Sequence, residues 1–200
     1  MQKEELMKIV VERIKNCKAC PLHKERTNVV PGEGSLDTPI MFVGEGPGEE
    51  EDLSGRPFVG RAGQLLTKIL ESVNIKREDV YITNIVKCRP PNNRTPTKEE
   101  ANTCSHFLLA QIEIINPKMI VTLGKAALDF FAGKSLPITK VRGQEFEWKA
   151  GIIVFPMFHP SYLLRNPSKE KGSPKDLTWQ DIKRVRKYYD QFLKERKVNE

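Results

Sequence analysis

Four short apolar runs, separated by segments with helical spacing, constrain the fold of this chain most. The runs are PIMFVGE (39–45), DVYITNIVK (79–87), KMIVTLG (118–124) and GIIVFPMF (151–158). Strands buried on both faces of a parallel sheet have this nearly continuous apolar character. Segments 61–73, 97–115 and 125–132 lie between the runs and have helical patterns. This alternation predicts an α/β layered fold with a mostly parallel sheet.

The remaining segments complete the expected outline. Residues 3–16 and roughly 174–194 read as helices, and 141–151 reads as a hairpin. Thr97 and Glu100 have the spacing of a capping box, which predicts a helix start at this point. Function in such folds sits in the loops after the carboxyl ends of the strands. Those loops are GEGPGEEED, NIVKCRPPNN, LGKAA and FHPSYLLR.

Length and composition exclude several classes of protein. A chain of 200 residues is long enough for one well-packed domain, which we expect to span residues 1–200. A mean hydropathy of −0.47 and the lack of any run of about 18 apolar residues argue against a membrane protein. The charged N-terminus does not resemble a secretory signal, so we expect a cytoplasmic protein. Abundant Lys, Arg and Glu with few Gln are typical of thermophiles.

The distribution of charge suggests a polyanionic partner. The net charge is +7, and residues 161–200 hold 11 Lys and Arg against 6 Asp and Glu. Residues 43–52 instead hold five acids and no base. A solvated amphipathic helix is the simpler explanation of the C-terminal charge.

Four cysteines have the spacing of a metal centre. Cys17 and Cys20 form a C-x2-C pair, while Cys88 and Cys104 are separated by 15 residues. A disulfide framework is not expected in an intracellular chain, and Cys17 does not follow a strand as a redox pair would. Four thiolates indicate zinc or an iron–sulfur cluster, and four unrelated buried cysteines are the alternative. The wide spacing of Cys88 and Cys104 fits a bulkier cluster slightly better than a zinc ribbon, which usually has two C-x2-C pairs.

Four motifs occur together with these cysteines. In order along the chain they are GEGPGEEED, GRPFVGRAGQLL, TNIVKCRPP and FHPSYLLR. Together they resemble the type-4 (family 4) uracil-DNA glycosylases over roughly residues 5–193. The resemblance implies a three-layer α/β/α fold with a central four-stranded, mostly parallel sheet. It also implies excision of uracil from DNA by a monofunctional glycosylase and a [4Fe–4S] cluster held by Cys17, Cys20, Cys88 and Cys104.

The resemblance also assigns the uracil pocket. Gly44, Glu45 and Gly46 match the motif whose backbone lines it, and Phe58 matches the aromatic residue that stacks on the base. Asn84 matches the reader of the uracil edge, and His159 matches the histidine near the base O2. We expect Glu45, Asn84 and His159 to act in catalysis. Without the resemblance, Phe58 reads as core, Asn84 as a strand-end cap and His159 as a turn residue.

The first motif departs from that of the best-known uracil glycosylases. Gly46 stands where those enzymes carry the aspartate that orients water, and Gly48 stands where a tyrosine excludes thymine. Glu51 or Glu49 could take over either task.

A DNA substrate requires groups that hold its backbone. Leu163 lies where the superfamily places a side chain that inserts into DNA. Basic candidates for phosphate contacts are Arg61, Lys87, Arg89, Arg165, Lys169 and Lys171.

Other functions fit parts of the sequence. One is a non-catalytic zinc or iron–sulfur module that binds nucleic acid, and another is the neighbouring glycosylase branch with broader substrates. A nucleotide-binding enzyme is disfavoured because GEGPG lacks the phosphate-loop pattern. The sequence identifies no replication-clamp partner, and we expect a monomer.

Overall fold

The four apolar runs form the centre of one six-stranded sheet with the order β1-β3-β2-β4-β6-β5. The structure is a computed structural model that describes residues 2–199. Strands β3, β2, β4 and β6 are parallel to one another, whereas β1 and β5 are antiparallel edge strands. The predicted three-layer α/β/α fold is confirmed, and the two-residue edge strands extend the expected four-stranded sheet.

The bounds of the elements follow the predicted alternation closely. The strands are β1 (Glu33–Gly34), β2 (Ile40–Gly44), β3 (Tyr81–Asn84), β4 (Met119–Leu123), β5 (Phe146–Glu147) and β6 (Ile153–Met157). The helices are α1 (Lys3–Lys15), α2 (Glu49–Ser54), α3 (Arg61–Glu71), α4 (Lys98–Ile115), α5 (Lys125–Ala132), α6 (Ile138–Val141), α7 (Pro160–Arg165) and α8 (Pro174–Asn199). Short 3-10 helices cover Pro21–Lys24, Arg77–Asp79, Pro91–Asn93 and Lys149–Gly151.

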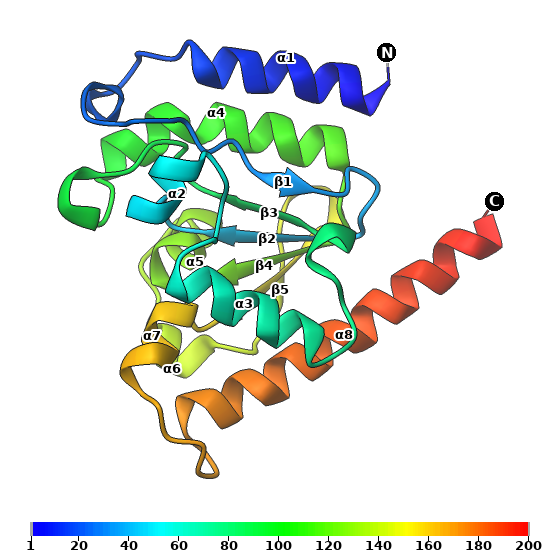
Figure 1. Cartoon of the computed structure of the whole chain (residues 1–200). Helices are drawn as coiled ribbons and strands as arrows, with labels where there is room; N and C mark the ends of the chain where they lie inside the picture. Colours follow the sequence, from blue (N-terminus) through cyan, green and yellow to red (C-terminus); the bar gives the residue numbers. More distant parts are fainter. Residues whose placement is uncertain (1, 200) are drawn as a thin grey trace.

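Both faces of the sheet are covered by helices (Figure 1). Alternate residues of β2 point to opposite faces, as strand geometry requires. Met41 and Val43 pack with α1, α4 and α5, whereas Ile40 and Phe42 pack with α3 and α8. The continuous apolar runs of the sequence are thus explained by burial on both sides.

Some local predictions were right and others were wrong. Thr97 accepts a hydrogen bond from the Glu100 amide and the Glu100 carboxylate accepts one from the Thr97 amide, so the capping box is confirmed. Residues 49–54 and 160–165 were expected to be loops and are short helices. The hairpin expected within 141–151 has other bounds, because β5 pairs with β6, and β6 lies beyond that segment.

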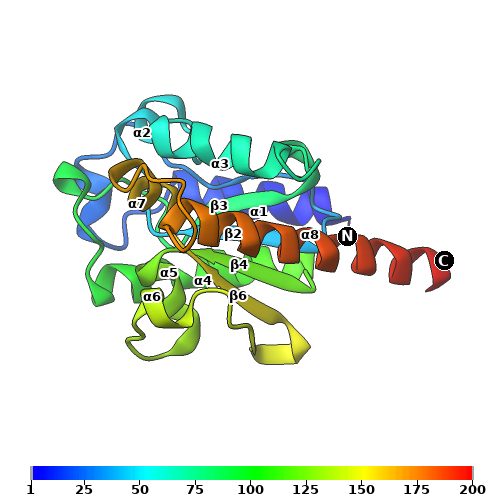
Figure 2. The same cartoon turned by 90° about the horizontal axis from the view of Figure 1, so that it is seen from below.

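Helix α8 continues past the predicted end and its last turns extend away from the body of the molecule (Figure 2). Its first half packs through Ile182 and Val185. Within residues 2–199, no helix has the length and apolar character needed to cross a membrane.

Candidate active site

A pocket lies at the carboxyl ends of the parallel strands, where the fold predicts a site. All four predicted loops contribute to its wall. Eight of the residues singled out from the sequence line it, namely Glu45, Gly46, Gly48, Glu51, Phe58, Asn84, His159 and Arg165.

Gly44 allows the pocket walls to close together. It ends β2 and lies beside Asn84, which ends β3. A Cβ atom on Gly44 would come within 2.5 Å of both the Asn84 side-chain oxygen and the Phe58 ring. Glycine is therefore required because any side chain would displace the two groups that face the pocket.

The Asn84 side-chain amide is buried but forms no hydrogen bond with the described part of the chain. Its side chain lines the pocket, and the residue is only 2% exposed. Among residues 2–199, its backbone carbonyl accepts a hydrogen bond from Lys87, but its side-chain amide has no protein partner. Buried amides are normally satisfied, so this amide is available to a ligand.

His159 is held as a neutral imidazole. It caps α7, and its Nδ1 accepts a hydrogen bond from the Ser161 backbone N–H at 3.1 Å. Nδ1 therefore carries no proton, and the remaining Nε2–H is a donor. Burial, together with the nearby Arg165 charge, lowers the pKa of His159 to about 4.

Phe58 lines the pocket beside His159. The two ring centroids are 5.7 Å apart with an angle of 34° between the planes. Phe58 is 6% exposed. An apolar ring beside polar groups is a suitable wall for a flat heterocycle.

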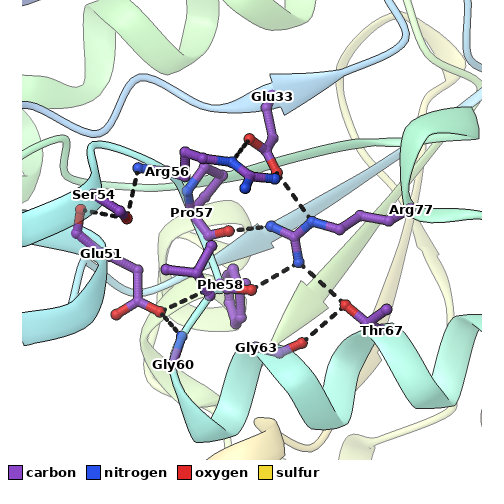
Figure 3. Close-up of polar contacts among 11 residues, drawn as sticks. Glu33, Glu51, Ser54, Arg56, Pro57, Phe58, Gly60, Gly63, Thr67 and Arg77 are labelled. Carbon is purple, nitrogen blue, oxygen red and sulfur yellow. Dashed lines mark hydrogen bonds and ion pairs between the residues drawn. The ribbon is translucent and has the colours of Figure 1, made fainter.

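Glu51 fills the space next to Gly48. A Cβ atom on Gly48 would lie 2.8 Å from Glu51 Oε2. The carboxylate accepts hydrogen bonds from the backbone N–H groups of Gly48 and Val59. It also accepts one from the Gly60 N–H (Figure 3). It is therefore fixed at the pocket wall. Glu49 is largely exposed and forms a long ion pair with Arg89 at 3.9 Å.

Glu45 is the second carboxylate of the pocket. It is partly buried, and burial raises its pKa above the ordinary value. Thr95 opposes this shift through a side-chain hydrogen bond. A carboxylate with a raised pKa is a better proton acceptor near neutral pH.

The four cysteines border a separate pocket on the α1 and α4 side of the sheet. Arg26 donates a hydrogen bond to Cys88 Sγ at 3.2 Å, which places a cation beside the sulfur atoms. Burial raises the pKa values of Cys20, Cys88 and Cys104, that of Cys104 to about 11. Within the described part of the chain, no three His, Cys, Asp or Glu side chains are arranged to hold a single metal ion.

Comparison with known proteins identifies the family. The model of the uracil DNA glycosylase superfamily matches residues 31–183. A type-4 uracil-DNA glycosylase of Thermotoga maritima is 69% identical over 84% of this chain and 88% of its own length. The chain belongs to the type-4 uracil-DNA glycosylases. The type-4 enzyme of Sulfurisphaera tokodaii is 48% identical over 88% of this chain and 82% of its own. A type-5 enzyme of Pyrobaculum aerophilum is 33% identical over 80% of this chain and 84% of its own, which disfavours the broader branch.

Lys87, which was predicted to contact DNA phosphates, is buried inside this type-4 chain. It is 1% exposed, and its Nζ donates to Thr83 Oγ1, the Asn84 carbonyl and Gln111 Oε1. Burial lowers its pKa to about 7. The side chain turns inward after the strand and supports the segment that carries Asn84.

Leu163 is also not the exposed leucine of its helix. It is 2% exposed, whereas Leu164 is 37% exposed. Successive residues on a helix point in directions about 100° apart, so burial of one exposes the next. The structure therefore presents Leu164, and not Leu163, on the surface of this helix, whereas the predicted insertion into DNA requires an exposed Leu163.

The basic candidates are placed differently with respect to the pocket. Arg165 is exposed and lines it, whereas Arg61, Lys169 and Lys171 are exposed outside its wall. Arg89 is one-quarter exposed, and its Nε donates to Asn93 Oδ1.

Two further cations at the pocket were missed, Arg94 and Lys125. Arg94 pairs with Glu100, and Lys125 pairs with Asp129. Only the position of their loops after β3 and β4 could have indicated them.

Proposed function

We propose that this chain, acting as a single domain, removes uracil from DNA by hydrolysing the N-glycosidic bond. The free Asn84 amide close to the Phe58 ring is the observation that carries the proposal. A base inside a duplex is out of reach, so the target nucleotide must first rotate into the pocket. Release of free uracil from a uracil-containing oligonucleotide tests the proposal directly.

Asn84 supplies the recognition of uracil. Uracil presents an N3–H donor beside an O4 acceptor, and a side-chain amide offers the matching acceptor and donor. Cytosine presents the reverse order and would leave buried groups unpaired. Each unsatisfied group costs about 1–3 kcal/mol.

His159 supplies the donor for the leaving group. Cleavage of the bond between C1′ and N1 leaves the electron pair on uracil, where negative charge develops at O2. The Nε2–H of the neutral imidazole stabilises that charge, as donors of an oxyanion hole do. The neutral imidazole acts here as a hydrogen-bond donor and does not transfer its Nε2 proton to the base.

Glu45 completes the hydrolysis. The sugar becomes a cation as uracil departs, and a water oxygen bonds to C1′. Glu45 accepts the proton that this water loses, and the raised pKa of its carboxyl favours the transfer. Glu51, rather than exposed Glu49, limits the space beside the base and excludes a 5-methyl group.

The four cysteines hold a [4Fe–4S] cluster. Their donor set fits, because four thiols from the 17–20 and 88–104 segments border one pocket with Arg26 beside them. When bound, the cluster supplies four iron–thiolate bonds that join the N-terminal segment to β3 and α4. Its role here is structural, since the cysteines do not line the uracil pocket.

The purified protein is expected to be brown, with broad absorbance near ~400 nm, because sulfur-to-iron charge transfer colours such clusters. Cys88→Ser should reduce this absorbance and the thermal stability more than it reduces the rate of the remaining soluble protein. Ser105→Ala, at a half-buried position of α4, is the control and should keep both the colour and the stability. A colourless, fully active protein with one bound zinc would contradict the cluster assignment.

DNA is held partly by Arg165 at the pocket mouth. Arg165→Glu should weaken binding to all DNA sequences and reduce the slope of log affinity against log salt by about one or more. Lys194→Glu makes the same charge change near the far end of α8 and should leave the slope nearly unchanged. Equal slopes for Arg165→Glu and the unmodified protein would place the DNA face elsewhere.

A further inference from the structure

The backbone of Phe58 is held in an unusual conformation. Its φ is +51°, in the left-handed region that non-glycine residues rarely adopt. Such conformations persist only when the surrounding structure enforces them, and they cluster at ligand-binding sites. The contacts around Phe58 therefore reveal what sets the direction of its ring.

Arg77 contacts this segment most extensively (Figure 3). Its guanidinium donates to the Phe58 carbonyl at 2.7 Å and also to the Pro57 carbonyl. It reaches Thr67 Oγ1 on α3 at 3.4 Å as well. Its side chain is only 16% exposed, so these bonds are shielded from water.

Glu33 orients the guanidinium. Its carboxylate accepts a hydrogen bond from Arg77 Nε at 3.0 Å and a second from Arg56 Nε at 2.8 Å. Burial acts to raise the pKa of Glu33, but the two arginines outweigh it and keep the pKa below its ordinary value. Strand β1 brings Glu33 to this point by pairing with β3.

The other side of the segment is fixed as well. Glu51 accepts from the Val59 and Gly60 amides, each at 2.8 Å. Gly63 lets α3 approach closely, because a Cβ atom there would lie 1.9 Å from the Phe58 carbonyl group. The Pro57 and Phe58 carbonyls are thus bound by the cation of Arg77, and the Val59 and Gly60 amides by the anion of Glu51.

We propose that Arg77, oriented by Glu33, is a positioning residue that sets the Phe58 ring against the flipped base. This rests on the proposed function, in which Phe58 stacks on uracil. Without the two carbonyl contacts, the backbone can relax to an ordinary negative φ. That change redirects the Cβ bond of Phe58 and moves the ring from the pocket wall.

The experiment compares two duplexes, each with one nucleotide to be flipped, of which only the first carries a base. One carries 2′-deoxy-2′-fluorouridine, whose fluorine destabilises the sugar cation and slows cleavage. The other carries a tetrahydrofuran abasic site, which offers nothing to stack. Arg77→Gln should weaken binding of the first duplex on the order of tenfold, the effect expected for loss of base–aromatic stacking. Binding of the abasic duplex should change less than about twofold.

Arg56→Gln is the matched control. It removes the same charge and the other partner of Glu33, but Arg56 is 61% exposed on its side chain and bonds no carbonyl of Pro57 or Phe58. Both affinities should stay within about twofold of the unmodified protein. Equal losses on the two duplexes for Arg77→Gln, or no loss on either, would overturn the proposal.

Phe58→Ala separates this proposal from the proposed function. If Phe58→Ala does not lower affinity for the fluorouridine duplex selectively, the stacking role itself fails. If it does and Arg77→Gln does not, only the positioning role fails. The double variant should bind no worse than Phe58→Ala alone, because Arg77 acts through that ring.

Glu33→Gln provides a second variant that leaves every Arg77 donor in place. It should cause a smaller loss than Arg77→Gln, again confined to the fluorouridine duplex. If Arg77→Gln does not fold, Glu33→Gln tests the positioning role in its place. An equal loss of affinity for both duplexes in Glu33→Gln, or no loss for either, would again overturn the proposal.

Discussion

Asn84→Asp is expected to lower uracil excision by orders of magnitude. The carboxylate keeps an acceptor for N3–H but faces O4 with a second acceptor, so a stabilising contact becomes a repulsive one. The N4 amino group of cytosine can now donate to the same oxygen. Cytosine should therefore be disfavoured less strongly than before. Single-turnover rates on matched uracil and cytosine duplexes measure both changes.

Asn93→Asp controls for the added negative charge. Asn93 lines the same pocket from an exposed position, and its Oδ1 accepts from Arg89, which an aspartate can still do. This variant should lose little activity and gain none on cytosine. If Asn84→Asp keeps near-normal uracil excision and rejects cytosine as before, Asn84 does not read the base.

His159→Ala is expected to slow bond cleavage by ~10²–10³, the usual effect of removing one donor to a developing oxyanion. Affinity for DNA should change little, because the hydrogen bond strengthens chiefly in the transition state. Single-turnover kinetics beside a binding measurement separates the two effects. With the pKa of His159 lowered to about 4, its titration should not reduce the rate above about pH 5.

His106→Ala removes a different histidine, which is exposed on α4 and does not line the pocket. It should leave both rate and affinity unchanged. An unchanged cleavage rate in His159→Ala would return His159 to the role of a helix cap, through its contact with the Ser161 amide.

The parallel centre of the sheet could be predicted from the sequence because its strands are apolar on both faces. Val43 and Phe42 point to opposite helical layers, so neither position tolerates a polar residue. The edge strand β1 could not be predicted, since it has only two residues and no pattern. Strand β5 lies within the predicted hairpin, but its partner strand lies beyond the predicted bounds. Helix α2 was missed because its acidic run resembles a solvated loop.

The pocket was predicted from motif order, but the direction of individual side chains was not. Lys87 and Leu163 lie in the expected segments and yet turn inward, since neither lies in a regular strand whose alternation would fix it. The contacts of Arg77 with Phe58 join residues 19 apart, and those of Glu33 join residues 44 apart. Long-range contacts of this kind leave no local signal.

The most direct test of the account is release of free base from three duplexes that differ only in one nucleotide, uracil, thymine or cytosine. The protein is compared with the His159→Ala, Asn84→Asp double variant prepared in the same way, which excludes a contaminating glycosylase. We predict release of free uracil with an abasic site in the uracil duplex alone, and loss of that release in the double variant. Tight binding of the uracil duplex without any released uracil would contradict the account and favour a non-catalytic nucleic-acid-binding module.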